Sequence, residues 1–219
     1  MMNSLHRSEI VKHLIIANVI FFVLFCMSAS PLYKFFPVLA LWYFDAPFFQ
    51  AWQLITHFFM HGSFMHIFFN MYALYLFGTV LERVWGAKRF MIFYFVTGVV
   101  AAVLYNLIGG IEYYMQYGTM FPYKAGFPVQ FIPMIGASGA VFGLLTAFAM
   151  LFPNTELRLL FPPIALKAKH FVLIYVGIEI YLSFTSFKGD NIAHFAHVTG
   201  ALVGFLLVKY WQKTSKTFY

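Results

Sequence analysis

HFFMHGSFMHIFFN, from His57 to Asn70, places three histidines and an asparagine inside one of the most apolar parts of the chain. His66 and Asn70 are four residues apart, so they share one face of a helix. Ser63, which follows Gly62, is a favourable N-cap residue and predicts that this helix begins there. A polar face in an apolar helix is unfavourable in lipid unless it faces other helices. The stretch therefore predicts a membrane helix whose polar face lies inside a bundle.

The composition of the whole chain makes lipid the solvent for most of it. The chain is 62% hydrophobic and 10% charged, whereas soluble domains carry about 25% charged residues. The net charge of +7 is divided among short clusters between apolar runs, which favours an anionic membrane surface and not nucleic acid as the partner. Because Cys26 is the single cysteine, no internal disulfide is possible.

Six segments approach the length of about 20 residues that a membrane span needs. We predict an all-α integral membrane bundle, a single domain over residues 1–219, with spans at approximately 13–29, 63–81, 90–109, 136–152, 169–187 and 193–211. Eleven of the 14 basic residues fall at the two termini and in the second and fourth loops. The positive-inside rule then places both termini in the cytoplasm. The first segment also resembles a signal peptide, but this charge alternation favours an uncleaved span.

Two of the loops on the external side are long. The first, residues 28–62, contains PVLALWYF and AWQLITHFF, which are too short to span and too apolar for water. We expect short helices at the membrane interface there. The third loop, residues 110–135, is rich in Tyr, Gly and Pro and either shapes substrate access or is a solvated insertion.

Two further motifs lie at the external ends of predicted spans. GASGAVFG, residues 136–143, places Ser138 between glycines, and Gly139 and Gly143 form a GxxxG pair that permits close helix contact. AHFAHVTGALVG, residues 193–204, contains His194 and His197, and the glycines Gly200 and Gly204 share a face with His197. Alone, each motif is more typical of helix packing than of chemistry.

Taken together, the three motifs indicate chemistry. A serine, a histidine and two side-chain donors come from three different spans that the charge pattern places at one depth on one side. A nucleophilic serine needs a base within hydrogen-bond reach, and a developing oxyanion needs oriented donors. The small residues beside Ser138 and His197 permit the close contact that this requires.

These motifs resemble those of the rhomboid family of intramembrane serine proteases. The matching patterns are HxxxxHxxxN at His61, His66 and Asn70, GxSG from Gly136 to Gly139, and AHxxG from Ala196 to Gly200. Their order and the six-span topology match as well. The resemblance covers nearly the whole chain, and the set is far more specific than any one motif.

The resemblance implies a Ser–His dyad without a third acid. Ser138 is the implied nucleophile and His197 the implied base. The implied oxyanion donors are the backbone N–H groups of Ala137 and Ser138 and the side chains of His66 and Asn70. The supporting residues that it implies are His57 and His61, which hold water, together with Gly136, Gly139, Phe142 and Gly200. It implies no cofactor and no metal, and the substrates are membrane-spanning segments of other proteins, cut near the external face.

The chain departs from common family features at three places. Gln53 follows Trp52 where many members have arginine, Phe142 replaces a tyrosine, and the third loop is long. The first change puts the anchoring of the first loop in doubt. Glu82 and Gly86, in LERVWG, resemble the family's exit from the second span, whereas Glu179 lies in the fifth predicted span without an assigned role.

Other functions remain open at this stage. His57 and His61 have the spacing of two metal ligands, but no HExxH motif accompanies them. A non-catalytic rhomboid-like binder of membrane segments would not need both Ser138 and His197. A transporter would need a polar path through the bilayer, and the polar residues gather at one end. The absence of a soluble domain or presequence predicts a bacterial inner membrane, and the oligomeric state stays open.

Overall fold

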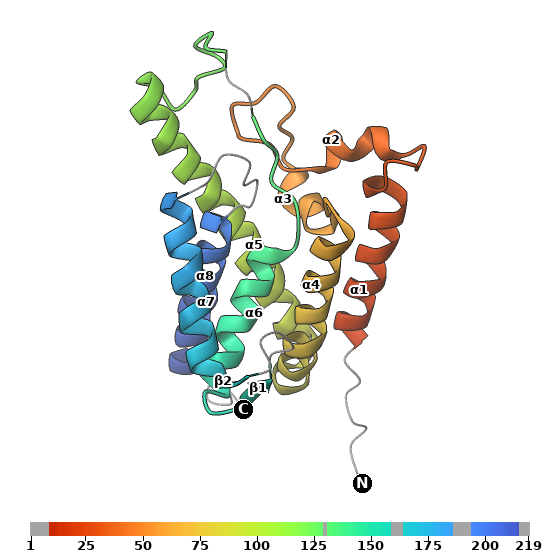
Figure 1. Ribbon diagram of the computed structural model, residues 1–219, viewed down its shortest axis with the longest axis vertical. Coiled ribbons are helices and arrows are strands. Elements are labelled where there is room, and N and C mark those ends of the chain that lie inside the picture. Colours follow the sequence, from red (N-terminus) through yellow and green to blue (C-terminus); the bar gives the residue numbers. More distant parts are fainter. Residues whose placement is uncertain (1–8, 129–130, 159–163, 186–193, 215–219) are drawn as a thin grey trace.

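Helices dominate the computed structural model, which describes residues 9–128, 131–158, 164–185 and 194–214 (Figure 1). The helices are α1 (Glu9–Phe21), α2 (Phe36–Leu39), α3 (Gln53–Thr56), α4 (Phe64–Ala73), α5 (Thr79–Tyr117), α6 (Ser138–Leu151), α7 (Ala168–Thr185) and α8 (His194–Thr214). Two π-helical segments, Phe22–Cys26 and Leu74–Gly78, continue α1 and α4, and 3-10 turns occupy Tyr33–Phe35 and His57–Phe59. The strands β1 (Glu156–Arg158) and β2 (Ala165–Lys167) form one antiparallel hairpin.

The long helices alternate in direction along one bundle (Figure 1). α1, the later part of α5, and α7 run one way, and α4, α6 and α8 run the other way. α2, α3 and the segment after α5 lie at one end, and the β1–β2 hairpin lies at the other. The expectation of an all-α chain misses this hairpin, although the fold is mostly helical as predicted.

Gly86 divides the longest helical run. Its backbone has φ 75° and ψ 161°, which is far from helical values and places it where glycine is favoured over other residues. The chain therefore reverses abruptly at Gly86, and no separate loop joins the two parts. The helices therefore fill most of the gap between the second and third predicted segments, residues 63–81 and 90–109.

Three described helical runs are long and apolar enough to cross a membrane, namely Glu9–Cys26, Phe64–Tyr117 and Ala168–Thr185. The second holds 54 residues, more than twice a normal span of about 20 residues, and it includes the break at Gly86. α6 is equally apolar but has 14 residues, which corresponds to about 21 Å of helix. The count of six spans and the side of the termini stay predictions.

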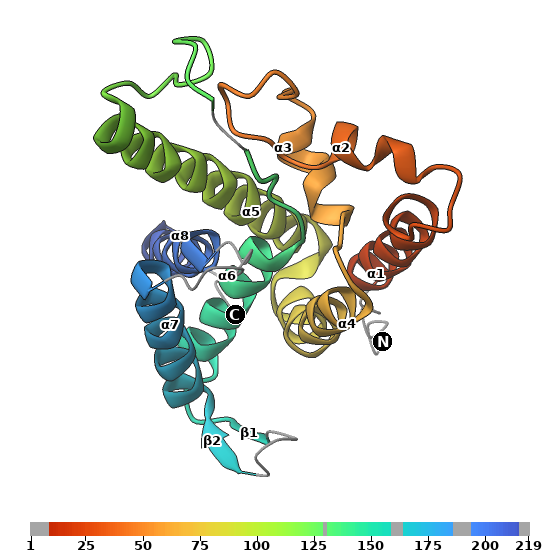
Figure 2. The ribbon, with the colours of Figure 1, turned by 45° about the horizontal axis from the view of Figure 1, so that its top comes forward.

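α6 is the central helix of the bundle, with α4, α5, α7 and α8 around it (Figure 2). Most of its side chains are buried, from Gly139 through Ala149 and also Leu151. α8 packs directly on its backbone. A Cβ atom at Gly200 would overlap the carbonyl of Gly139, and one at Gly204 would lie 2.7 Å from the Cα of Gly143. The predicted close approach of these glycine pairs is confirmed.

The third helix continues well beyond its predicted end at Gly109. α5 includes Gly109 and Gly110 and ends at Tyr117, where Gly118 adopts the left-handed conformation with φ 72°. The reason is packing by aromatic side chains, since the ring of Tyr113 lies 4.9 Å from that of Tyr43 in the first loop. The third loop accordingly begins eight residues later than predicted.

The third loop packs on the first loop. Asp45 accepts hydrogen bonds from the backbone N–H groups of Tyr123 (2.6 Å) and Lys124 (3.3 Å), and its other oxygen lies 3.9 Å from the Lys124 ammonium. The Tyr43 hydroxyl donates to the carbonyl of Met120 at 2.8 Å. These contacts fasten the third loop as a cover over one end of the bundle, while most of residues 118–128 are exposed. Its role in substrate access stays a prediction.

Glu82 fastens the start of α1 to α5. Its two carboxylate oxygens accept hydrogen bonds from the backbone N–H groups of Ile10 (2.9 Å) and Val11 (3.0 Å), and the side chain is buried. The first N–H groups of a helix lack partners within the helix and carry partial positive charge. The Glu82 carboxylate accepts these N–H groups and offsets their partial positive charge, which explains the glutamate of LERVWG in structural terms.

Candidate active site

Ser138 is the first residue of α6, and a turn at Gly136 that favours glycine places it there. Gly136 has φ 104°, and a Cβ atom on it would lie 2.6 Å from Nε2 of His66. The Gly136 N–H donates to the carbonyl of His57 at 2.9 Å. The first intrahelical bond of α6 runs from the N–H of Val141 to the carbonyl of Ala137. The N–H groups at the start of α6 are therefore available to an anion.

His66 extends over this turn from the first turns of α4. Ser63 caps α4 as predicted, since its hydroxyl accepts the N–H of His66 at 3.1 Å. The ring nitrogen Nδ1 of His66 accepts a long hydrogen bond, 3.4 Å, from the N–H of Gly62. The proton of a neutral ring then sits on Nε2, the atom that faces Gly136. His66 is thus oriented to donate toward the start of α6.

Asn70 lies one turn further along α4 and is buried. Its amide nitrogen donates one hydrogen bond to the carbonyl of His66, at 2.9 Å. An amide carries two N–H donors, so the second remains for a ligand. Its buried Oδ1 has no partner among the residues that the structure describes. Asn70 therefore has one N–H group left to donate to a ligand.

His197 is held against the face of α6 that carries Ser138. Its ring stacks on that of Phe142, with centroids 4.4 Å apart and an interplanar angle of 9°. Phe142 follows Ser138 by one turn, so both project from the same face of α6. Within the described chain, the Ser138 hydroxyl forms no hydrogen bond. Such catalytic contacts often tighten only when substrate binds.

Glu179 on α7 contacts the edge of the His197 ring. Its Oε2 lies 2.9 Å from Nδ1 of His197 and 2.6 Å from Nδ1 of His194. All three side chains are buried. Because a carboxylate oxygen only accepts, each imidazole donates through Nδ1, which leaves Nε2 of His197 as an acceptor. Sequence analysis assigns no partner to Glu179, although a lone carboxylate in a span and a second histidine near His197 are signals that could have found one.

Among the described residues, these three form a group that could hold a metal ion, because their possible ligand atoms all lie within 4.8 Å of one another. The ligand atoms of a tetrahedral zinc lie about 3.3 Å apart, given bonds near 2.0–2.1 Å. The separations of 2.6 and 2.9 Å from one shared oxygen fit hydrogen bonds instead. His57 and His61, the pair considered as metal ligands above, do not belong to this cluster.

Comparison with known proteins identifies the family of this chain. The sequence profile of the Rhomboid domain matches residues 49–213. The chain belongs to the rhomboid family. Its apolar helices and this membership make it an integral membrane protein.

Several curated rhomboid proteins are similar to this chain. The putative rhomboid protease YdcA of Bacillus subtilis is 31% identical over 160 residues, which are 72% of this chain and 66% of YdcA. Rhomboid protein 1, mitochondrial, of Saccharomyces cerevisiae is 29% identical over 161 residues, 74% of this chain and 42% of that protein. The rhomboid protease GlpG of Haemophilus influenzae is 25% identical over 158 residues, 72% and 68% of the two chains. The match thus spans less than two thirds of the first two relatives.

In this rhomboid, Gln53 anchors the first loop. Its amide oxygen accepts the N–H groups of Trp42 (3.3 Å) and Gln50 (3.2 Å), and its amide nitrogen donates to the carbonyls of Val38 (3.2 Å) and Phe48 (2.9 Å). A neutral amide offers both donors and acceptors, whereas a guanidinium only donates. The doubt about loop anchoring is therefore resolved in favour of an anchored loop.

His57 and His61 lie near the end of this loop and are both buried. Burial lowers the pKa of His57 to about 4, and burial followed by the proximity of His66 lowers that of His61 to about 3, so both rings are neutral near pH 7. His57 Nδ1 donates to the carbonyl of Gln53 at 2.7 Å. Neither ring nitrogen of His61 has a partner in the described part of the protein, a situation that ordered water normally resolves.

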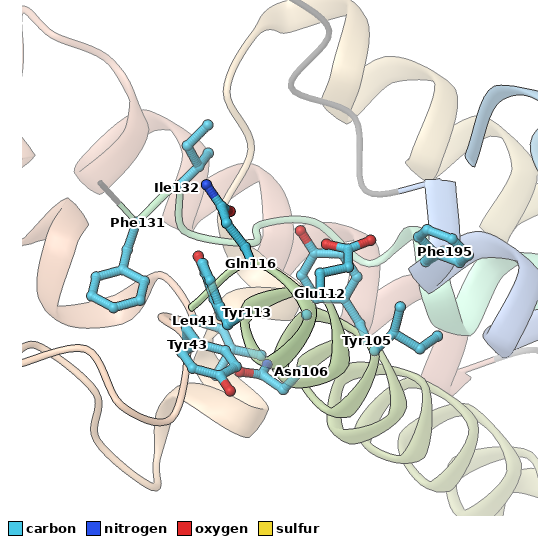
Figure 3. A pocket seen from close by; sticks show the side chains of 12 residues that line it. Leu41, Tyr43, Tyr105, Asn106, Glu112, Tyr113, Gln116, Phe131, Ile132 and Phe195 are labelled. Atoms are coloured by element: carbon cyan, nitrogen blue, oxygen red, sulfur yellow. The ribbon is translucent and has the colours of Figure 1, made fainter. Parts of the chain in front are cut away.

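A cavity of about 160 Å³ lies beside the site, under the cover formed by the first and third loops. Figure 3 shows Glu112 and Gln116 of α5 between Phe131 and Ile132 at one edge and Phe195 at the other. None of the residues proposed for chemistry lines it. The cavity is separate from the cluster around His197.

Proposed function

We propose that this chain is a serine endopeptidase that cuts membrane-spanning segments of other proteins. The observation that carries the proposal is the placement of His197, stacked on Phe142 one turn from Ser138. Its relatives in Bacillus subtilis and Haemophilus influenzae bear the name protease, which supports the same reaction class.

The proposed reaction is acyl transfer followed by hydrolysis. The Ser138 oxygen bonds to the scissile carbonyl carbon while its proton passes to Nε2 of His197, and the carbonyl electrons move to oxygen. The carbon–nitrogen bond then breaks, and Nε2 returns the proton to the departing amine. Water repeats the sequence on the ester, with His197 again as base. Each step conserves protons and needs no cofactor.

The oxyanion would form at the start of α6. The backbone N–H groups of Ala137 and Ser138 are the proposed main-chain donors, and Nε2 of His66 and the amide of Asn70 the proposed side-chain donors. The contacts of His66 with Gly62 and Gly136 support this orientation. Gly139 and Gly200 support it indirectly, because they let α8 bring His197 close to α6.

We further propose that six helical runs cross the membrane, with both termini cytoplasmic and residues 1–219 as one domain. The alternating runs in Figure 1 support this topology. The short, buried α6 would begin below the external surface, which places Ser138 within the membrane. A helical substrate must unwind there before its carbonyl is reached, so helix-weakening residues favour cleavage. The bacterial inner membrane stays a prediction, since relatives occur in bacteria, yeast and plants.

Purified protein in detergent, mixed with a panel of single-span substrates, tests the function. Wild type should yield two products whose masses define one cut near the external end, and S138A should yield none. A metal chelator should leave the rate unchanged. Cleavage by S138A at the wild-type rate, or its loss with chelator, would overturn the proposal.

A further inference from the structure

Glu179 is one of three buried residues on α7, with Ala168 and Val172. Its neighbours along the helix, Ile178 and Ile180, are 48% and 43% exposed, as expected for side chains facing lipid. Burying a carboxylate is unfavourable unless it is paired and hydrogen-bonded. Carboxylates inside membrane helices are therefore mostly functional. An apolar residue would pack α7 on α8 at lower expense, so this position needs a reason.

The partners of Glu179 supply that reason. Nδ1 of His197 donates to Oε2 at 2.9 Å, and Nδ1 of His194 donates to the same oxygen at 2.6 Å. With Nδ1 protonated, Nε2 of His197 carries the lone pair that must take the Ser138 proton. When Nε2 takes it, the ring becomes a cation beside a buried carboxylate, and the attraction is strong where water is scarce.

We propose that Glu179 is a positioning residue of this protease, the acid of a Ser138–His197–Glu179 set in place of a simple dyad. It fixes the tautomer and ring angle of His197 and stabilises the imidazolium that forms in each acyl-transfer step. This inference rests on the proposed function of Ser138 and His197. Phe142 holds the ring face, and Glu179 holds its edge.

The charged and titratable groups around His197 come from three helices. Glu179 and, one turn earlier, Tyr175 lie on α7, and His194 lies on α8. His66 on α4 is close enough to interact electrostatically with His197. Within the described residues, Glu179 is the one carboxylate bonded to these histidines. It alone offsets the positive charge that forms on His197.

The test compares wild type, S138A, E179Q, E179D and E112Q as purified full chains on one single-span substrate. E179Q keeps the size of the side chain but removes the charge. It should lower kcat on the order of 10²-fold with KM within about twofold, less than the roughly 10⁴-fold for the buried acid of a Ser-His-Asp triad. It should slow fluorophosphonate labelling of Ser138 in parallel. E179D should recover at least part of the loss.

E112Q is the matched control. It makes the same change at an exposed carboxyl of α5 that lines the cavity in Figure 3, away from His197, so its kcat should equal that of wild type. Thermal unfolding of each variant separates loss of fold from loss of chemistry. Wild-type kcat and labelling in a folded E179Q would overturn the role of Glu179 alone. So would a loss in E179Q that follows only its unfolded fraction. A wild type that neither cleaves nor labels would overturn the proposed function as well.

Discussion

Glu82 and Glu179 are both buried carboxylates in apolar helices, yet they differ in what they bind. At the start of α1, which we call the capped end, Glu82 accepts from the backbone N–H groups of Ile10 and Val11. At the histidine end, formed by Glu179, His194 and His197, the donors are imidazoles. Backbone donors keep their protons at all ordinary pH values, whereas an imidazole can exchange its proton. The partner, and not burial, therefore separates a structural carboxylate from one suited to chemistry.

The largest expected effect lies at the histidine end. H197A should lower kcat by about 10⁶-fold, the scale for removing the base of a serine protease, because no other group within reach takes the Ser138 proton. Thermal unfolding of H197A separates this loss from loss of fold, because the variant also removes the stacking on Phe142 and one partner of Glu179. Turnover of a single-span substrate measures the loss, and residual turnover within tenfold of wild type would remove His197 from the mechanism.

A smaller loss is expected for N70A on α4. Removing one oxyanion donor raises the barrier by about 2.7–4 kcal/mol, or 10²- to 10³-fold in kcat. KM should change little, since the donor acts on the developing charge. An N70A variant with lower affinity and unchanged kcat would show that Asn70 binds substrate instead.

The capped end should respond in the opposite manner. E82Q replaces one acceptor oxygen by an N–H donor that faces the N–H groups of Ile10 and Val11. The free energy of unfolding should fall by about 1–3 kcal/mol, with kcat of the folded protein unchanged. Denaturant unfolding and turnover of the same sample give both quantities. A fall in kcat with unchanged stability would erase the distinction between the two ends.

A final expected effect is a pH dependence of stability due to His61. Its pKa is about 3 in the folded protein because of burial, against 6.5 in the unfolded chain. The unfolded chain therefore binds the proton first, and stability falls as the pH decreases from 6.5 toward 3, by up to about 1.4 kcal/mol per unit. H61F should flatten this slope between pH 6 and 4. An unchanged slope in H61F would place the titration elsewhere.

Much of the bundle follows from apolar lengths, because a helix in lipid must satisfy its own backbone. The reversal at Gly86 and the extension of α5 to Tyr117 do not follow, since a backbone angle and aromatic packing with the first loop decide them. A hydropathy pattern contains no information on either feature. The same holds for Gln53, whose four hydrogen bonds join segments that no local pattern connects.

The candidate site was predictable only where its residues repeat at helical spacing. His66 with Asn70, Gly139 with Gly143, and His197 with Gly200 and Gly204 follow from such spacing and from the family motifs. The bond between Glu179 and His197 joins α7 to α8 and depends on how the two helices are rotated. A resemblance that implies a dyad also gives no reason to look for an acid. The chemical roles of all these residues stay predictions.

Reaction with a fluorophosphonate, followed by peptide mass spectrometry, tests the central claim most directly. The adduct should appear on Ser138 in wild type, slowly in E179Q, and not in H197A, because only an activated serine attacks phosphorus. An adduct at another residue, or unmodified Ser138 in a preparation that cleaves its substrate, would contradict the assignment of Ser138 as the nucleophile.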